Sequence, residues 1–176
     1  MEKVFNAYSS YYNLLYKDKD YASEADYIAD LIKQYKPEAK TLIEFGSGTG
    51  KHALLFCQKG FIVKGIEPSE EMIKIAQQNK HANLSFANTS IEGLNIEERF
   101  EVASALFHVV SYLNYNNELI NSFKNIHKHL NENGLFIFDL WYTPAVLSQI
   151  PEKRIKTTED EHIKVIRNAT PVNHWN

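Results

Sequence analysis

The chain lacks the features that mark several classes of protein. Its single cysteine, Cys57, cannot form a disulfide or a cysteine-based metal site within one chain. No apolar run approaches the roughly 18 residues of a membrane span, and the N-terminal segment lacks the apolar centre of a signal peptide. Lys and Arg number 19 against 22 Asp and Glu, so no excess of positive charge favours nucleic acid. We therefore predict a cytoplasmic protein whose partners include neither a membrane nor a nucleic acid.

The most informative stretch is residues 41–50, TLIEFGSGTG, in which a short apolar run precedes three glycines at alternate positions. The apolar run predicts a strand. Gly46, Gly48 and Gly50 predict a turn, because glycine tolerates left-handed backbone angles and lets a ligand approach the main chain. Residues 51–59 predict a helix behind the turn, and the first N–H groups of that helix carry a partial positive charge. The stretch is therefore typical of a ligand-binding loop between a strand and a helix.

A second apolar run, residues 61–66, ends in Glu67, whose carboxylate can accept hydrogen bonds from the hydroxyls of a ribose. The spacing of the glycines excludes a P-loop, because that motif needs four residues between its first glycine and its Gly-Lys pair, and only three separate Gly46 from Gly50. A dinucleotide fingerprint needs glycine at its sixth position, where this chain has Lys51. A nicotinamide-dependent oxidoreductase is thus disfavoured, but it stays open as an alternative.

The acid at position 44, the three glycines and the second acid resemble motif I and its surroundings in class I S-adenosylmethionine-dependent methyltransferases. The resemblance implies an α/β, Rossmann-like sheet of strand order 3-2-1-4-5 with helices on both faces, and S-adenosylmethionine as the cofactor. It further implies that the glycine loop accommodates the amino-acid part of the cofactor, while Glu67 holds its ribose and Met72 faces its adenine. Ser90 stands where many relatives carry an aspartate that contacts the adenine. The residues implied at the cofactor are Tyr16, Glu44, Gly46, Ser47, Gly48, Gly50, Glu67, Pro68, Met72, Ser90, Ile91 and Leu106.

The N-terminal segment is rich in aromatic residues, and Tyr8, Tyr12 and Tyr16 share one face if it is helical. One interpretation is an amphipathic cap that packs on the domain. Residues 11–21 also resemble the N-terminal arm of small-molecule methyltransferases, including the nucleotide-linked aminosugar N-methyltransferases. In these relatives the arm covers the cofactor and its tyrosines line the methyl-transfer pocket. On this resemblance Tyr12 is a candidate catalytic residue.

Residues 100–107 predict a strand covered on both faces, and His108 follows at its carboxyl end. Ligands of open α/β sheets bind outside the carboxyl ends of the strands, so we expect residues 106–112 to form the floor of the active site. His108 is our candidate for a catalytic base. The alternative is a histidine that only hydrogen-bonds a neighbour. No paired metal-ligand spacing is present, and we predict no metal.

The remaining pattern predicts helices at 22–35, 69–79 and 117–130, and strands at 84–87 and 135–140. We expect residues 1–150 to form the methyltransferase domain with its arm. Residues 155–158 and 163–167 predict a β-hairpin, and this tail, residues 151–176, resembles the start of the lid of some small-molecule methyltransferases, which implies a partial lid.

Methyltransferases of the kind that the chain resembles normally finish with two more strands, whereas the residues after strand 135–140 predict only a hairpin. We therefore expect the given sequence to lack the last two strands, which would make strand 135–140 an open edge. We expect the tail hairpin, a second copy of the chain or strands of a longer parent protein to cover this edge. Our hypothesis is that the 176 residues are a truncated form, which binds cofactor more securely than it turns over acceptor.

These patterns together predict an enzyme that transfers the methyl group of S-adenosylmethionine to a nitrogen or oxygen of a small metabolite. An alternative function is a binding protein or fragment that holds S-adenosylmethionine without turnover. The acceptor cannot be read from the sequence, because acceptor pockets are built from loops and lids that vary independently of the cofactor site.

Overall fold

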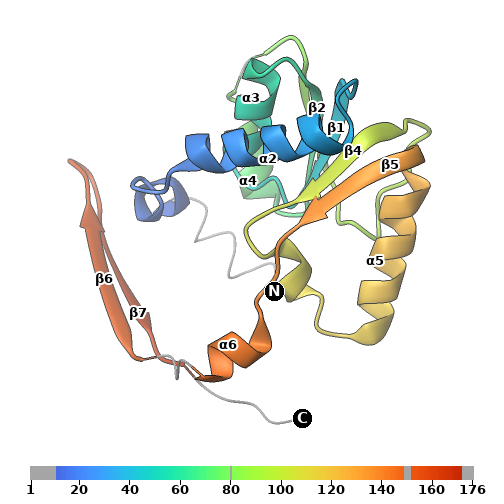
Figure 1. Cartoon of the computed structure of the whole chain (residues 1–176). Helices are drawn as coiled ribbons and strands as arrows, with labels where there is room; N and C mark the ends of the chain where they lie inside the picture. The colour runs from blue at the N-terminus through green and yellow to red at the C-terminus, as the bar shows by residue number, and fades with distance from the viewer. Residues whose placement is uncertain (1–10, 80, 149–151, 172–176) are drawn as a thin grey trace.

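A five-stranded parallel sheet in the order β3-β2-β1-β4-β5 forms the centre of the computed structural model, which describes residues 11–79, 81–148 and 152–171 (Figure 1). This order confirms the predicted fold class. The strands are β1 (Thr41–Phe45), β2 (Ile62–Glu67), β3 (Leu84–Asn88), β4 (Phe100–Ala105) and β5 (Leu130–Phe138). Parallel strands need crossover connections, and helices supply most of them, as the alternation of apolar runs and amphipathic segments predicts.

Helices cover both faces of the sheet, as expected. The helices of the domain are α2 (Tyr21–Tyr35), α3 (Lys51–Gln58), α4 (Glu70–Ala76), α5 (Asn116–Lys128) and α6 (Thr143–Ser148). On one face, α2 and α3 pack against Leu42, Val63 and Val102 of the central strands. On the other face, Ile126 of α5 joins Ile43 in a second apolar cluster. None of the helices in the described ranges is long and apolar enough to cross a membrane.

Local capping explains where two of these helices begin. Ser69 accepts a hydrogen bond from the backbone of Met72 at 3.4 Å, so it is the N-cap of α4, as predicted. The helix predicted to begin at residue 22 begins one residue earlier, at Tyr21, because Asp20 is the N-cap and accepts a hydrogen bond from the Ser23 backbone at 2.9 Å. The predicted helix boundaries are therefore right to within a few residues.

The largest differences from prediction lie around β4 and β5. The strand predicted to end at residue 107 ends at Ala105, because Phe107 and His108 have left-handed backbone angles, with φ of 64° and 65°. A short 3₁₀ helix, η1 (Val109–Tyr112), follows and was not predicted, and neither was α6. The helix predicted to reach residue 130 ends at Lys128, and the strand predicted at residues 135–140 begins earlier, at Leu130, and ends at Phe138.

The predicted hairpin is present as β6 (Arg154–Glu159) and β7 (Lys164–Ala169), which pair antiparallel. It does not cover the edge of β5. Figure 1 shows it on the opposite side of the molecule, beside the N-terminal segment. There the Lys156 Nζ donates to the backbone oxygen of Leu15 at 2.7 Å. Of the three alternatives for covering the edge of β5, the tail hairpin is therefore wrong, because β6 and β7 form a sheet of their own that contacts the N-terminal segment instead. The predicted boundary between domain and lid at residue 150 lies outside the described residues.

Candidate functional site

The glycine loop has the geometry that the sequence predicts. Gly46, Gly48 and Gly50 have φ of 67°, 55° and 77°, which a residue with a side chain adopts only with strain. A Cβ atom added to Gly46 would meet a side-chain carbon of Val109 at 2.4 Å, whereas one added to Gly48 would meet nothing within 4 Å. Gly48 therefore borders open space, which a ligand of the loop can fill.

Glu67 lies at the carboxyl end of β2 and contacts this loop directly. Its Oε2 accepts a hydrogen bond from the Gly48 backbone at 3.0 Å, and its Oε1 accepts one from the Ser69 backbone at 2.9 Å. Burial raises the pKa of Glu67, against the effect of these two N–H groups. Each carboxylate oxygen can accept a further hydrogen bond, so two neighbouring hydroxyls fit this acid.

The end of β3 is tied to the same place through a residue that the sequence analysis missed. The Asn88 side-chain amide donates to the backbone oxygens of Glu67 at 2.9 Å and Pro68 at 3.0 Å. Ser90, the predicted adenine contact, is exposed, and its hydroxyl accepts from the Gly93 backbone at 3.0 Å. Ile91 next to it is 9% exposed and belongs to the core. The hydroxyl of Ser90 thus already has a structural partner, and a contact to a cofactor stays a prediction.

Three more predicted residues are mostly buried. Met72 on α4 is 4% exposed and Leu106 is 9% exposed. Ser47 is 7% exposed, and its backbone N–H donates to Ile66 at 3.0 Å while its buried hydroxyl has no partner in the described part of the chain. This hydroxyl lies close to Gly65 of β2, where an added Cβ atom would meet it at 2.8 Å, so a contact to a cofactor stays a prediction.

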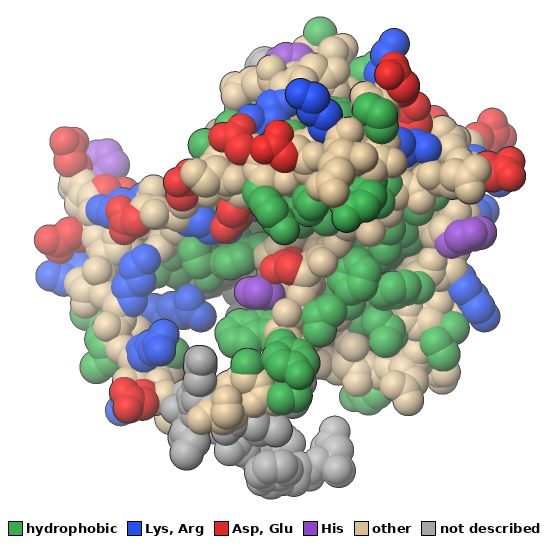
Figure 2. Space-filling model, viewed as in Figure 1, with side chains coloured by type: hydrophobic (Ala, Val, Ile, Leu, Met, Phe, Trp, Pro, Cys, Tyr) green, Lys and Arg blue, Asp and Glu red, His purple; other side chains and the backbone are tan. Residues whose placement is uncertain are grey.

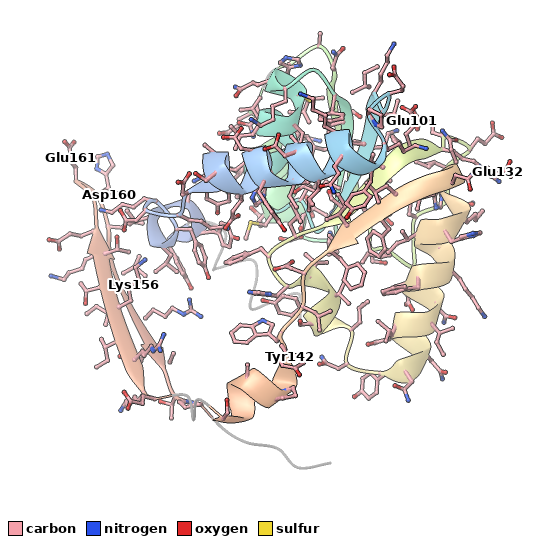
Figure 3. The ribbon with its side chains drawn as sticks, viewed as in Figure 1. Glu101, Glu132, Tyr142, Lys156, Asp160 and Glu161 are labelled. Carbon is pink, nitrogen blue, oxygen red and sulfur yellow. The ribbon has the colours of Figure 1, made fainter. Side chains whose placement is uncertain are left out.

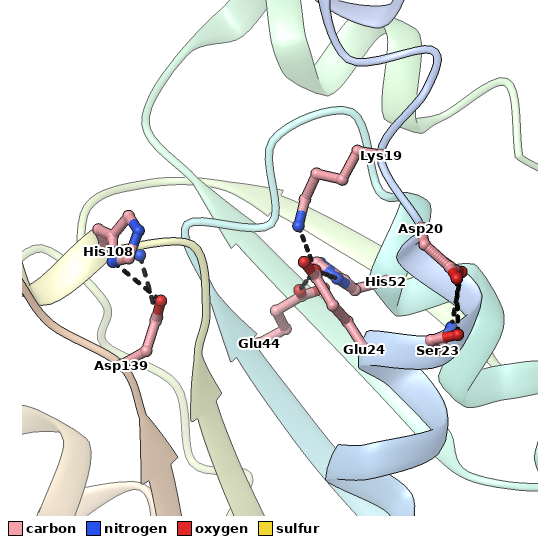
Figure 4. Close-up of polar contacts among 8 residues, drawn as sticks. All are labelled: Lys19, Asp20, Ser23, Glu24, Glu44, His52, His108 and Asp139. Atoms are coloured by element: carbon pink, nitrogen blue, oxygen red, sulfur yellow. Dashed lines mark hydrogen bonds and ion pairs between the residues drawn. The ribbon is translucent and has the colours of Figure 1, made fainter.

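His108 is brought against a residue that the sequence analysis did not pair with it (Figure 4). Its Nδ1 lies 3.0 Å from Asp139 Oδ2, and its backbone N–H donates to Asp139 Oδ1 at 2.9 Å. The carboxyl ends of β4 and β5 are neighbours, so the two residues meet just beyond them. The Trp141 ring lies 4.9 Å from the imidazole ring. Asp139 therefore holds the left-handed backbone of His108 through a hydrogen bond, and its carboxylate lies beside the imidazole ring.

The N-terminal segment lies against the loop, as an arm would. Tyr12 and Tyr16 have ring centres 4.7 Å apart, and the Tyr16 ring meets Phe107 edge-on at 5.2 Å. Asn13 accepts a hydrogen bond from the Thr49 hydroxyl at 3.0 Å, which joins the segment to the glycine loop. Tyr8, expected on the same face, lies outside the described residues. These contacts place the segment beside the glycine loop and fit both a cap that packs on the domain and an arm, and a role in covering the cofactor stays a prediction.

An apolar hollow of about 690 Å³ opens beside Trp141, between η1, α5 and the end of β5. Figure 2 shows hydrophobic side chains gathered over this part of the surface. The residues that line the hollow are Val110, Ser111, Tyr112, Leu113, Leu119, Phe123, Phe138, Leu140 and Trp141.

Within the described ranges, no group of three or more His, Cys, Asp and Glu side chains is placed to hold a metal.

Comparisons with known proteins agree on one family. A family model described as a methyltransferase domain matches residues 18–173. The chain is 29% identical over 139 residues to the dTDP-3-amino-3,4,6-trideoxy-alpha-D-glucopyranose N,N-dimethyltransferase of Streptomyces venezuelae, covering 78% of this chain and 58% of the relative. It is 27% identical over 128 residues to the dTDP-4-amino-2,3,4,6-tetradeoxy-D-glucose N,N-dimethyltransferase of Saccharopolyspora spinosa, covering 73% of this chain and 51% of that relative. The crystal structure of Streptomyces venezuelae DesVI superposes with a TM-score of 0.80 at 27% identity, over 96% of this chain and 72% of DesVI. The chain thus spans about half of the length of these two sugar methyltransferases.

Proposed function

The chain belongs to the methyltransferase domain family, whose members use S-adenosylmethionine, and we propose that it methylates the amino nitrogen of a small acceptor, an aminosugar linked to a nucleotide. The observation that carries the cofactor part of this proposal is the loop itself. Open space borders Gly48, and the Glu67 carboxylate bonds to the Gly48 backbone N–H. Family membership also makes the oxidoreductase alternative unnecessary.

Different residues at the carboxyl ends of the strands are assigned to different parts of the cofactor. The two oxygens of Glu67 would accept hydrogen bonds from the ribose hydroxyls, and the glycine loop with Glu44 would receive the amino-acid part. When bound, S-adenosylmethionine supplies a methyl group that its sulfonium already activates. The protein then needs mainly to hold the acceptor nitrogen in line with that methyl group and to exclude water.

His108 has the chemistry of an acid–base group for the acceptor. An amine must arrive unprotonated, and its nitrogen loses a proton after it has gained the methyl group. An imidazole with one nitrogen against Asp139 keeps the other available for this proton. The ring of Tyr16 packs on Phe107, the residue before His108, so the arm lies close to His108. The face of an aromatic ring in this position favours a nearby cation.

The hairpin supports an acceptor that carries negative charge. The register pairs Lys156 with Arg167 and Arg154 with Ala169, so Arg154, Lys156 and Arg167 share one face. Lys156 points from this face toward the arm (Figure 3), where it bonds to Leu15. All three cations are exposed, and a diphosphate between a nucleoside and a sugar matches their charge.

The proposal is tested by incubating the chain with S-adenosylmethionine and dTDP-linked 3-amino or 4-amino sugars, followed by mass spectrometry. We expect products heavier by one or two methyl groups, and less product from the same sugar without its nucleotide. An inactive chain that still binds S-adenosylmethionine would favour the binding-protein alternative. The cytoplasmic location stays a prediction.

A further inference from the structure

Three titratable side chains form a connected line between β1, α3 and α2 (Figure 4). Glu44 on β1 is 2% exposed, and its Oε2 has no hydrogen-bond partner in the described part of the chain. His52, in the first turn of α3, is 7% exposed, and its Nδ1 lies 3.7 Å from Glu44 Oε1. The Nε2 of the same ring lies 2.9 Å from Glu24 Oε2. A buried carboxyl group with an unpartnered oxygen is costly, so this one needs an explanation.

The outer end of the line reaches the segment that joins the arm to α2. Glu24 also forms an ion pair with Lys19, whose nitrogen lies 4.5 Å from the centre of the Phe107 ring. This ion pair keeps Glu24 a carboxylate, so His52 donates its hydrogen from Nε2 to Glu24. The lone pair of Nδ1 therefore faces Glu44.

The surroundings decide where the proton lies before a ligand binds. Burial raises the pKa of Glu44 to about 8, against the Ala53 backbone N–H, and Glu67 adds to the rise. Burial lowers the pKa of His52, against the hydrogen bond to Glu24. At neutral pH, Glu44 is thus a neutral acid and His52 a neutral base. The other charged or titratable groups close to the pair, among the described residues, are Lys19, Tyr21, Lys51, Cys57, Glu67 and Asp139.

We propose that His52 takes the proton of Glu44 when the ammonium of the cofactor's amino-acid part binds at the glycine loop. The 3.7 Å between Nδ1 and Oε1 is longer than a hydrogen bond, so the two side chains must first approach each other. The O–H bond of Glu44 then breaks and an N–H bond forms at Nδ1, so no proton leaves the protein. The ammonium favours the carboxylate of Glu44, and the imidazolium is held between the carboxylates of Glu44 and Glu24. The proposal rests on the proposed function, because that function brings the ammonium to Glu44. His52 is accordingly a positioning residue that acts through Glu44.

Nuclear magnetic resonance of the ring nitrogens of histidine tests the transfer in the wild-type chain. The seven histidines are labelled with ¹⁵N, and His52 is identified from the spectrum of His52→Gln. Saturating S-adenosylhomocysteine, which has the same ammonium, should convert His52 to imidazolium. The analogue 5′-methylthioadenosine lacks the amino-acid part and should leave the ring neutral. A ring that stays neutral with S-adenosylhomocysteine bound overturns the inference alone, whereas a chain that does not bind S-adenosylhomocysteine overturns the proposed function as well.

Calorimetry in two buffers of different ionisation enthalpy gives an independent count of protons. Wild-type chain should release almost none at pH 7 on binding S-adenosylhomocysteine, because His52 retains the proton. His52→Gln should release about one per ligand bound. The exposed His127 on α5 supplies the matched control, and His127→Gln should behave as wild type. Equal proton release by wild type and His52→Gln contradicts the transfer.

Discussion

Glu67 makes the clearest contribution of any single residue to the predicted cofactor site. Its carboxylate accepts backbone hydrogen bonds from Gly48 and Ser69 and has capacity for two hydroxyls. Hydrogen bonds to a charged group contribute roughly 1.5–3 kcal/mol, so Glu67→Ala should weaken binding of S-adenosylmethionine about ten- to a hundredfold. Calorimetry measures this, with the exposed Glu132→Ala on β5 as a control that should bind normally. An affinity within twofold of wild type in folded Glu67→Ala removes Glu67 from the site.

Glu44 should also make the stability of the free chain depend on pH. Burial raises its pKa from 4.5 to about 8, so between these values the folded chain holds a proton that the unfolded chain has lost. The contribution of Glu44 to the free energy of unfolding is therefore complete below about pH 4.5 and falls as pH rises toward 8. Across this window, the free energy of unfolding of Glu44→Gln should rise relative to that of wild type, by about 1.4 kcal/mol per pH unit at most. Denaturant unfolding at several pH values checks this, and a constant difference between the two chains would contradict it.

Residue types and spacing identify the loop and its acids, but not their partners. The meeting of His108 with Asp139 depends on which strands are neighbours, and 31 residues separate the two in sequence. The bond from Thr49 to Asn13 depends on the path of the arm, for which the sequence has no periodic signal. The positions of Glu44 and Glu67 at the ends of their strands could be predicted from the sequence, since each acid ends an apolar run.

At the scale of elements, the apolar runs and caps predict most strands and helices, whereas the order of the strands in the sheet was implied by the resemblance to methyltransferases. The misplaced end of β4 arises from left-handed Phe107 and His108, two residues whose types do not predict such angles. The pairing of the hairpin strands is a local property that the sequence pattern predicts. The surface on which the hairpin packs depends on contacts with Leu15 and other arm residues, and the alternative that placed it on β5 was therefore wrong. Local pattern therefore predicts elements well and their docking poorly.

The arm should depend on its bond to the glycine loop. Thr49→Val keeps the shape of the side chain but leaves the Asn13 oxygen without its donor, which costs about 0.5–1.5 kcal/mol. We expect faster amide hydrogen exchange over residues 11–16 and a two- to tenfold loss of cofactor affinity, about the same free energy. The exposed Thr157→Val on β6 is the control. Unchanged exchange in Thr49→Val would show that other contacts hold the arm.

At the scale of the whole molecule, β5 is the last strand of the sheet, and no strand among the described residues pairs with its outer side. An open edge with the apolar sequence LFIF at residues 135–138 favours pairing with another chain. We expect concentration-dependent association in light scattering, together with slower amide exchange at these residues as concentration rises. A monomer at all concentrations, with rapid exchange along this edge, would contradict association through β5.

The central claim is that the loop from Gly46 to Gly50, with Glu67, binds S-adenosylmethionine. The most direct measurement is a calorimetric titration of the wild-type chain with S-adenosylhomocysteine, beside a titration with NADH. The account predicts saturable binding at one site for S-adenosylhomocysteine and no heat of binding for NADH. Binding of NADH at this site, or the absence of any binding of S-adenosylhomocysteine to the folded chain, would contradict it.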